Sequence, residues 1–143
     1  MQERVLFELD FQYTYDTVCP NIQVYIDNQH CATLDKQSSC KFYHAQDFGS
    51  HELRIERSGK DHTCPEQMVQ IQRIRIDGID IRNMMYHTSV CNPEYPEPWA
   101  TEQREAGVEL EKDIIGETVF GHNCTWSFNY TSPFWHFVME QIR

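Results

Sequence analysis

The chain lacks any long hydrophobic run and is poor in basic residues. No segment approaches the roughly 20 consecutive apolar residues that a membrane-spanning helix needs, so the sequence predicts no transmembrane segment. Its 12 Lys and Arg residues stand against 22 Asp and Glu residues, which gives a formal net charge of −10. Such an acidic surface repels phosphate backbones and anionic lipid headgroups. We therefore expect neither nucleic acid nor membrane as a partner, whereas cations and neutral glycans fit this charge.

The chain also lacks the local signatures of nucleophilic and phosphate chemistry. It contains no Gly-x-Ser-x-Gly turn and no glycine-rich phosphate loop. The carboxylates of Glu109 and Glu111 could act as a pair on a glycosidic bond. They alternate with Val108 and Leu110, however, and on a strand this alternation places both carboxylates on the solvent face. The sequence therefore predicts a protein that is not an enzyme.

The N-terminus does not have the composition of an export signal. Residues 1–10 carry charges throughout and already alternate as a strand, whereas a signal peptide needs a continuous apolar segment. If the chain starts at its natural Met, we expect no export by the usual route. Free thiols are then the favoured state of the cysteines, and disulfides stay open as the alternative. The chain has six cysteines: Cys19, Cys31, Cys40, Cys64, Cys91 and Cys124.

Alternation of apolar and polar residues with a period of two recurs along most of the chain. A first strand is predicted from Val5 to Tyr15, another over residues 49–57, and a hairpin or a bent strand at the turn Asp77-Gly78. This pattern is typical of half-buried antiparallel strands and leaves almost no room for helices. With 143 residues the chain is long enough for one domain with its own core. The predicted fold is an all-β, jelly-roll-like β-sandwich spanning residues 1–143, with eight or nine antiparallel strands.

The second half contains a proline-rich segment and further strand candidates. Residues 91–107 include three prolines between positions 93 and 98, so we predict an extended, ordered loop there. One helical turn is expected at residues 101–106. Strands are predicted over residues 108–115 and 118–120, and over residues 125–130 with Trp126, Phe128 and Tyr130 on one face.

Two aromatic residues in the proline-rich loop are candidates for glycan binding. Tyr95 and Trp99 flank Pro96 and Pro98, and these prolines can hold an aromatic ring rigidly for a sugar ring to stack on. The alternative is that Trp99 folds back and covers one sheet. The sequence leaves both interpretations open.

Three aspartates at predicted turns are candidates for a calcium site. Asp27, Asp77 and Asp80 flank turns where carboxylate oxygens could collect around Ca²⁺. No calcium-loop spacing is present, and Asp is favoured in turns for conformational reasons alone. We therefore expect no cofactor, with Ca²⁺ as an open alternative.

Two His-x-Cys pairs could in principle hold zinc. His62 with Cys64, and His122 with Cys124, would each share one strand face and could together form a Cys₂His₂ set. The spacing matches no standard zinc module. Surface histidines beside buried cysteines are the simpler expectation.

The terminal segment, residues 132–143, is apolar on both faces of a predicted strand. A last strand buried on both sides would explain this pattern. An exposed patch that docks a neighbouring subunit would explain it equally well, because monomers rarely display such surface. The candidate docking residues are Phe134, Trp135, Phe137, Val138 and Met139.

Several of these segments together resemble known proteins. Residues 74–81, 95–103 and 126–134, with residues 49–53 upstream, resemble small virion structural proteins of marine tailed phages. The sandwich pattern is also similar to calcium-dependent xylan-binding carbohydrate-binding modules. The likeness covers roughly residues 20 to 138, and it carries no residue roles with it.

The resemblance implies a virion component located on the capsid surface or the tail. We expect a non-enzymatic structural or decoration protein that docks onto other virion proteins or copies of itself, and contacts host-surface glycans through Tyr95 and Trp99. Many weak contacts would then act through avidity. The alternative is a free glycan-binding module, with or without Ca²⁺. A glycan hydrolase or lyase is the third alternative.

Overall fold

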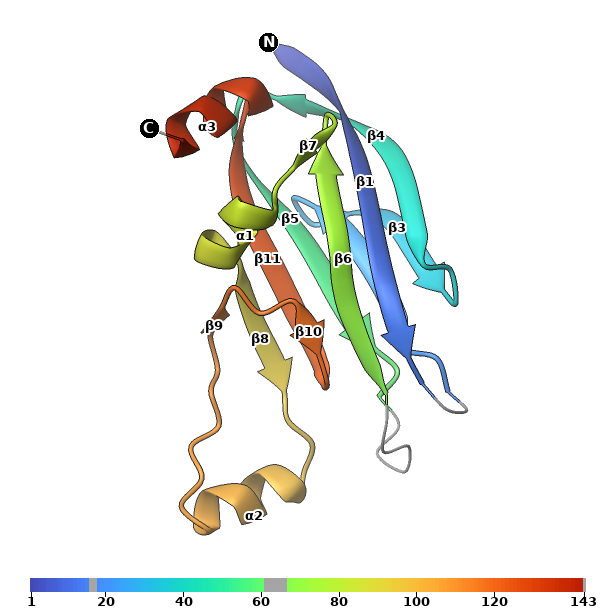
Figure 1. Cartoon of the computed structure of the whole chain (residues 1–143), viewed down its shortest axis with the longest axis vertical. Coiled ribbons are helices and arrows are strands. Elements are labelled where there is room, and N and C mark those ends of the chain that lie inside the picture. Colours follow the sequence, from blue (N-terminus) through green and yellow to red (C-terminus); the bar gives the residue numbers. More distant parts are fainter. Residues whose placement is uncertain (16–17, 61–66, 143) are drawn as a thin grey trace.

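Two antiparallel β-sheets pack face to face to form a sandwich (Figure 1). The computed structural model describes residues 1–15, 18–60 and 67–142. The five-stranded sheet has the order β10-β6-β1-β4, with β7 paired to β6, and the six-stranded sheet has the order β3-β2-β5-β11-β8-β9. All of these strand pairs are antiparallel. The predicted all-β sandwich is confirmed, with eleven strands in the described residues instead of eight or nine.

Three long strands and two short ones build the five-stranded sheet. The strands are β1 (Gln2–Thr14), β4 (Ser39–Asp47), β6 (Met68–Ile76), β7 (Ile79–Asp80) and β10 (Val119–Phe120). The six-stranded sheet consists of β2 (Asn21–Ile26), β3 (Gln29–Asp35), β5 (Gly49–Ser58), β8 (Val90–Glu94), β9 (Ile114–Ile115) and β11 (Asn123–Ser132). The two-residue strands β7, β9 and β10 account for most of the difference from the expected number.

The core lies between the sheets and follows the predicted alternation. Alternate residues of β1 from Val5 to Phe11 point inward and are buried, while their neighbours face solvent. Phe7 stacks on Phe42 of the neighbouring strand at a centroid distance of 5.4 Å and reaches Tyr130 across the sandwich at 6.2 Å. Burial of one face of each sheet is the main favourable contribution to folding here.

Three short helices contradict the expectation that the chain has almost no room for helices. They are α1 (Arg82–Thr88), α2 (Trp99–Glu105) and α3 (Phe134–Gln141). The helical turn expected at residues 101–106 coincides with most of α2. The other two helices line the side of the sandwich next to β11 (Figure 1). Helices of seven or eight residues span only two turns, too few for a periodicity of 3.6 residues to stand out in the sequence.

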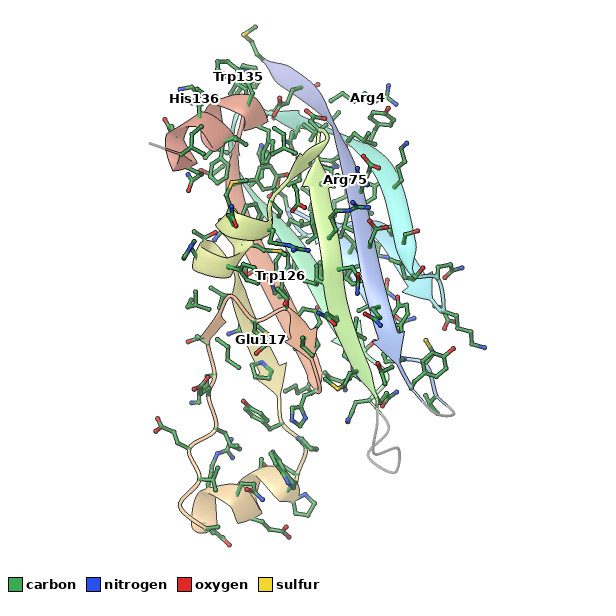
Figure 2. All side chains as sticks on the ribbon, viewed as in Figure 1. Arg4, Arg75, Glu117, Trp126, Trp135 and His136 are labelled. Carbon is green, nitrogen blue, oxygen red and sulfur yellow. The ribbon has the colours of Figure 1, made fainter. Side chains whose placement is uncertain are left out.

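The terminal segment is a helix and not a last strand. Helical spacing places Phe134, Phe137 and Val138 on one side, where Phe134 is buried and the other two are partly buried against the core. Trp135 and Met139 lie on the other side and are 64% and 56% exposed. Figure 2 shows Trp135 on α3, away from the sandwich interior where Trp126 lies. Of the two interpretations of this segment, the two-sided buried strand is therefore wrong.

The proline-rich region is more regular than predicted, and the segment after it is less regular. Residues 90–94 form β8, which pairs with β11 and places Pro93 opposite Cys124. The strand predicted over residues 108–115 is reduced to β9, because no regular element occupies residues 108–113. Gly107 has a φ of +86°, a left-handed conformation that ends α2 and redirects the chain. No helix in the described part of the chain is long and apolar enough to cross a membrane.

Neighbouring residues on α3 test this packing. Replacing Phe134 by Ala should lower the free energy of unfolding by about 3–5 kcal/mol, since the ring is 1% exposed. The same change at Trp135 should cost about 0.5 kcal/mol or less. Urea unfolding of both variants measures the difference. Equal losses would show that α3 does not pack in this orientation.

Candidate functional site

The segment between β8 and β9 forms an arm that projects from one end of the sandwich, at the opposite end from α3 (Figure 1). Hydrogen bonds from Asn92 and Tyr95 join its two limbs. The side-chain amide of Asn92 donates to the carbonyl of Lys112 at 3.0 Å, and the hydroxyl of Tyr95 donates to the carbonyl of Glu111 at 2.7 Å. The two limbs of the arm are therefore joined by direct contacts.

Three aromatic rings cluster between the arm and the turn that joins β10 to β11. The ring centroids of Tyr95 and Trp99 lie 6.1 Å apart, and that of His122 lies 5.2 Å from Tyr95 and 5.6 Å from Trp99. Trp99 is 38% exposed, whereas Tyr95 and His122 are half-buried. Trp99 thus packs on Tyr95 of the arm and on His122 of the β10–β11 turn, and it keeps part of its surface open to solvent. The structure brings Tyr95 and Trp99 together, as the sequence interpretation required.

A small cavity of about 150 Å³ lies behind this cluster, lined among others by Tyr95, His122 and Glu117. Cys91 of β8 and Cys124 of β11 also line it and hydrogen-bond each other. That hydrogen bond lowers the pKa of the Cys91 thiol and raises the pKa of the Cys124 thiol. Burial, together with the nearby charge of Glu111, raises the pKa of Tyr95. Tyr95 therefore stays a neutral hydrogen-bond donor.

The described cysteines are free, and the described histidines do not gather into a metal centre. Five cysteines outside residues 61–66 are free thiols. Within residues 1–15, 18–60 and 67–142, no group of three or more His, Cys, Asp or Glu side chains is arranged to hold a metal ion. His62 and Cys64, one half of the zinc hypothesis, lie outside the described residues. His122, in the other half, packs against aromatic rings.

The three candidate calcium ligands do not come together. Asp27 lies in the β2–β3 turn of the six-stranded sheet, whereas Asp77 and Asp80 flank the β6–β7 turn of the other sheet. Each carboxylate already accepts a backbone hydrogen bond: Asp27 from Glu52, Asp77 from Leu6, and Asp80 from Arg82. These aspartates therefore cap turns and strand ends, as ordinary turn chemistry favours.

Glu109 and Glu111 are exposed, but they do not lie on a strand. They belong to the irregular segment that follows α2, because β9 begins only at Ile114. Their exposure agrees with the sequence interpretation, although its reason, strand alternation, was wrong. What Glu111 supplies to the site is its backbone carbonyl, which accepts the hydrogen bond from Tyr95.

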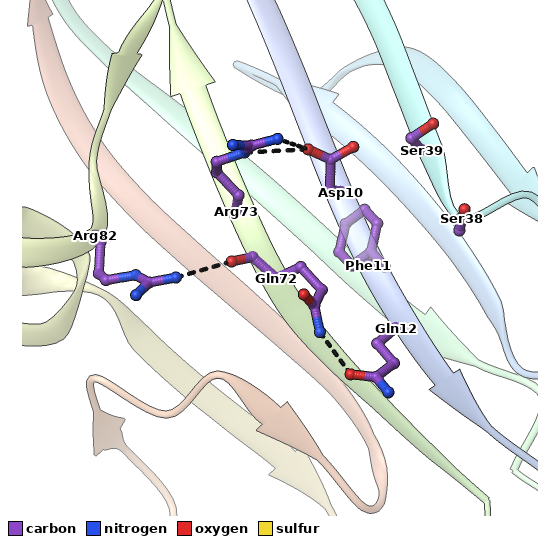
Figure 3. Close-up of a pocket in the computed structure, with 8 residues that line it drawn as sticks. All are labelled: Asp10, Phe11, Gln12, Ser38, Ser39, Gln72, Arg73 and Arg82. Carbon is purple, nitrogen blue, oxygen red and sulfur yellow. Dashed lines mark hydrogen bonds and ion pairs between the residues drawn. The ribbon is translucent and has the colours of Figure 1, made fainter.

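A larger recess lies on the outer face of the five-stranded sheet (Figure 3). Its volume is about 660 Å³, and its lining is mostly polar, with Asp10, Arg73 and Arg82 as the charged members. Sequence reasoning missed this recess. Its residues come from three separate strands and α1, and only strand pairing places them side by side.

Comparisons with known proteins show the fold and no closer relation. No protein-family model matches the chain, and no curated protein matches it. The solved structure of vCBM60, a carbohydrate-binding module, in complex with galactobiose superposes with a TM-score of 0.51 at 11% sequence identity. The match covers 89% of this chain and 99% of the module. The predicted similarity to a carbohydrate-binding module is thus confirmed at the level of the β-sandwich, whereas a relation to phage virion proteins is not shown.

The ion pair between His51 of β5 and Asp27 of the β2–β3 turn makes the stability of the sandwich depend on pH. Both ring nitrogens of His51 lie 2.5 Å from oxygens, Nδ1 from the Asp27 carboxylate and Nε2 from the Asp47 carbonyl. Two acceptors require two donors, so the ring is an imidazolium. Burial lowers the pKa of His51, but the hydrogen bonds and charges of Asp27 and Asp47 outweigh this and raise it above its ordinary value.

A raised pKa in the folded state means that protonation of His51 stabilises the fold. This contribution should be complete below the unfolded-state pKa of about 6.5 and should be lost as the pH rises through the folded-state pKa. We therefore expect the urea midpoint of the wild type to fall between pH 6 and pH 9 more steeply than that of His51→Asn. Parallel pH profiles would contradict this account.

Proposed function

We propose that this protein is a non-enzymatic glycan-binding module whose arm presents Trp99 and Tyr95 to a sugar ring. The observation that carries the proposal is the partly exposed indole of Trp99, held beside Tyr95 and His122 on a β-sandwich. The fold supports it, because a sandwich of the same type was solved with galactobiose bound.

Stacking on this cluster needs little reorganisation of the protein. The C–H face of a sugar packs favourably on an aromatic ring, and the gain is larger when the ring is already fixed. Tyr95 is fixed by its hydrogen bond to the carbonyl of Glu111, and Arg104 of α2 pairs at 3.6 Å with Glu97, which precedes the helix. Both contacts hold the arm in the conformation that exposes Trp99.

The charge of the arm favours a neutral ligand. Acidic residues outnumber basic ones between positions 91 and 113, where the only cations are Arg104 and Lys112. An anionic sugar approaching Trp99 would meet this negative field. The acidic residues of the segment are Glu94, Glu97, Glu102, Glu105, Glu109, Glu111 and Asp113.

Removing the indole tests the proposal. Trp99→Ala should weaken binding to a neutral galactan oligosaccharide about tenfold, which corresponds to the roughly 1–1.5 kcal/mol expected for one stacked ring. Isothermal titration calorimetry measures the loss, once with Ca²⁺ and once with EDTA. Tyr43→Ala is the matched control, because Tyr43 is 56% exposed on β4, outside the arm.

Neutral xylan, galactan and glucan oligosaccharides should be compared in the same titrations. Equal affinities of the Trp99 and Tyr43 variants would remove the arm from the binding surface. If the wild type binds none of the neutral glycans, the proposed function itself is overturned.

We propose as a second candidate that the module docks through α3 onto copies of itself in a larger assembly such as a virion. The observation that favours it is the exposure of Trp135 and Met139 on the outer side of α3. Because α3 and the arm lie at opposite ends of the sandwich, docking through α3 would leave the arm free to face outward (Figure 1). Host-surface glycans are the ligands that such an outward arm would meet.

Self-assembly separates this candidate from a free module. Wild-type protein should sediment as an oligomer, and the double variant Trp135→Ser, Met139→Ser should shift it to a monomer, because apolar docking surface is lost. Analytical ultracentrifugation over a concentration series measures the shift. A monomeric wild type would favour the free glycan-binding module.

A further inference from the structure

An irregularity in strand pairing shapes the recess on the outer face of the five-stranded sheet. The register between β1 and β6 shifts between Asp10 and Phe11, so that Asp10 pairs with Arg73 while Phe11 pairs with Ile71. The extra residue, Gln72, is left opposite no partner in β1. Its side chain instead donates a hydrogen bond to Gln12 at 2.5 Å (Figure 3). Such bulges re-aim side chains and are common beside binding sites.

The balance of charge in this recess is opposite to that of the whole chain. Two guanidinium groups, of Arg73 and Arg82, and one carboxylate, that of Asp10, line the recess in a chain whose formal net charge is −10. Arg73 reaches Asp10 through Nε and Nη2, but both distances are 3.4 Å. Charge-assisted hydrogen bonds are normally about 2.7–2.9 Å long, so this pair is loose.

The guanidinium of Arg82 has few hydrogen-bond partners among the described residues. It donates to the backbone carbonyl of Gln72 at 3.3 Å, which aims it across the edge of β6 toward the recess (Figure 3). The nearby carboxylate of Asp80 accepts a hydrogen bond from the Arg82 backbone amide. Among the described residues, Arg82 forms no ion pair. A guanidinium carries five N–H donors, and only one hydrogen bond joins that of Arg82 to the described residues, so donors are available for a ligand.

The recess lacks what a neutral sugar would use for stacking. Phe11 is the sole aromatic residue among those that line it in the described part of the chain, and this residue is 3% exposed. Specific binding must therefore come from polar groups. A forked guanidinium matches a planar carboxylate with two parallel hydrogen bonds. The volume of about 660 Å³ is in the range of pockets that hold small ligands.

We propose that this recess binds the carboxylate of a uronic acid unit in an acidic glycan, with Arg82 as the principal carboxylate ligand and Arg73 beside it. The amides of Gln12 and Gln72 and the hydroxyls of Ser38 and Ser39 supply donors and acceptors for the sugar hydroxyls. The choice of a sugar as ligand rests on the proposed glycan-binding function. The surface is a different one from the Trp99 arm, and the charge preference is opposite.

The test compares two oligosaccharides that differ in the carboxylate. Galacturonic acid oligosaccharides and their carboxyl-reduced, neutral counterparts are titrated into the full chain by calorimetry at fixed ionic strength. We expect Arg82→Gln to weaken galacturonate binding about tenfold or more and to leave the neutral ligand unchanged. Arg4→Gln is the matched control, because this substitution removes the same charge at a place outside the recess. Arg4 lies on β1, where its guanidinium stacks on the ring of Tyr43.

Further titrations separate the effect of guanidinium geometry from that of charge, and a loss of binding from a loss of folding. Arg82→Lys keeps the charge without the fork, so its affinity for galacturonate should lie between those of the wild type and Arg82→Gln. A sulfated galactan oligosaccharide should bind more weakly than galacturonate. Retained binding of the neutral ligand shows that each variant is folded.

Three results would overturn the inference. They are absence of galacturonate binding by the wild type, equal losses in Arg4→Gln and Arg82→Gln, and equal or tighter binding of the sulfated ligand. If the neutral ligand binds while galacturonate does not, the uronate site is refuted and the glycan-binding function stands. If neither ligand binds, the glycan-binding function falls with it.

Discussion

Stacked aromatic side chains along β11 hold both ends of this molecule in place. Trp126 and Phe128 lie 6.4 Å apart with nearly parallel rings, and Phe128 and Tyr130 continue the stack at 6.3 Å. Phe134 of α3 extends it, with its ring 5.9 Å from Tyr130. β11 pairs with β5 on one side and β8 on the other. The arm that leaves from β8 and the helix that follows β11 are therefore both positioned by one buried strand.

The two candidate ligand surfaces have opposite electrostatic character. The arm carries mostly acidic residues around an exposed indole, whereas the recess between β1 and β6 contains two arginines, one carboxylate and no exposed ring. Stacking and charge pairing thus occur in separate places. Under the two proposals above, an acidic polysaccharide with neutral stretches would offer partners to both surfaces, and weak contacts at two places on one chain would strengthen each other through effective concentration.

The sequence predicted the strands well and the helices poorly, for a definable reason. Alternation over eight or more residues, as in β1, β5 and β11, is unambiguous because one face must be buried. The run after Pro133 is equally apolar in either conformation, so its pattern could not distinguish a strand from a helix. Contacts of Phe134 and Phe137 with Tyr130 and Phe128 decided for the helix.

Composition and local pattern by themselves determined the all-β class, the acidic net charge, and the nearness of Tyr95 and Trp99 in the chain. These features depend on residues within a few positions of one another. Only the tertiary structure decided that His122 joins the two rings, that Asp27 lies on a different sheet from Asp77 and Asp80, and that Arg82 reaches the Gln72 carbonyl at the bulge between β1 and β6. Each of these depends on strand pairing between distant segments, and a local pattern does not encode the register of that pairing.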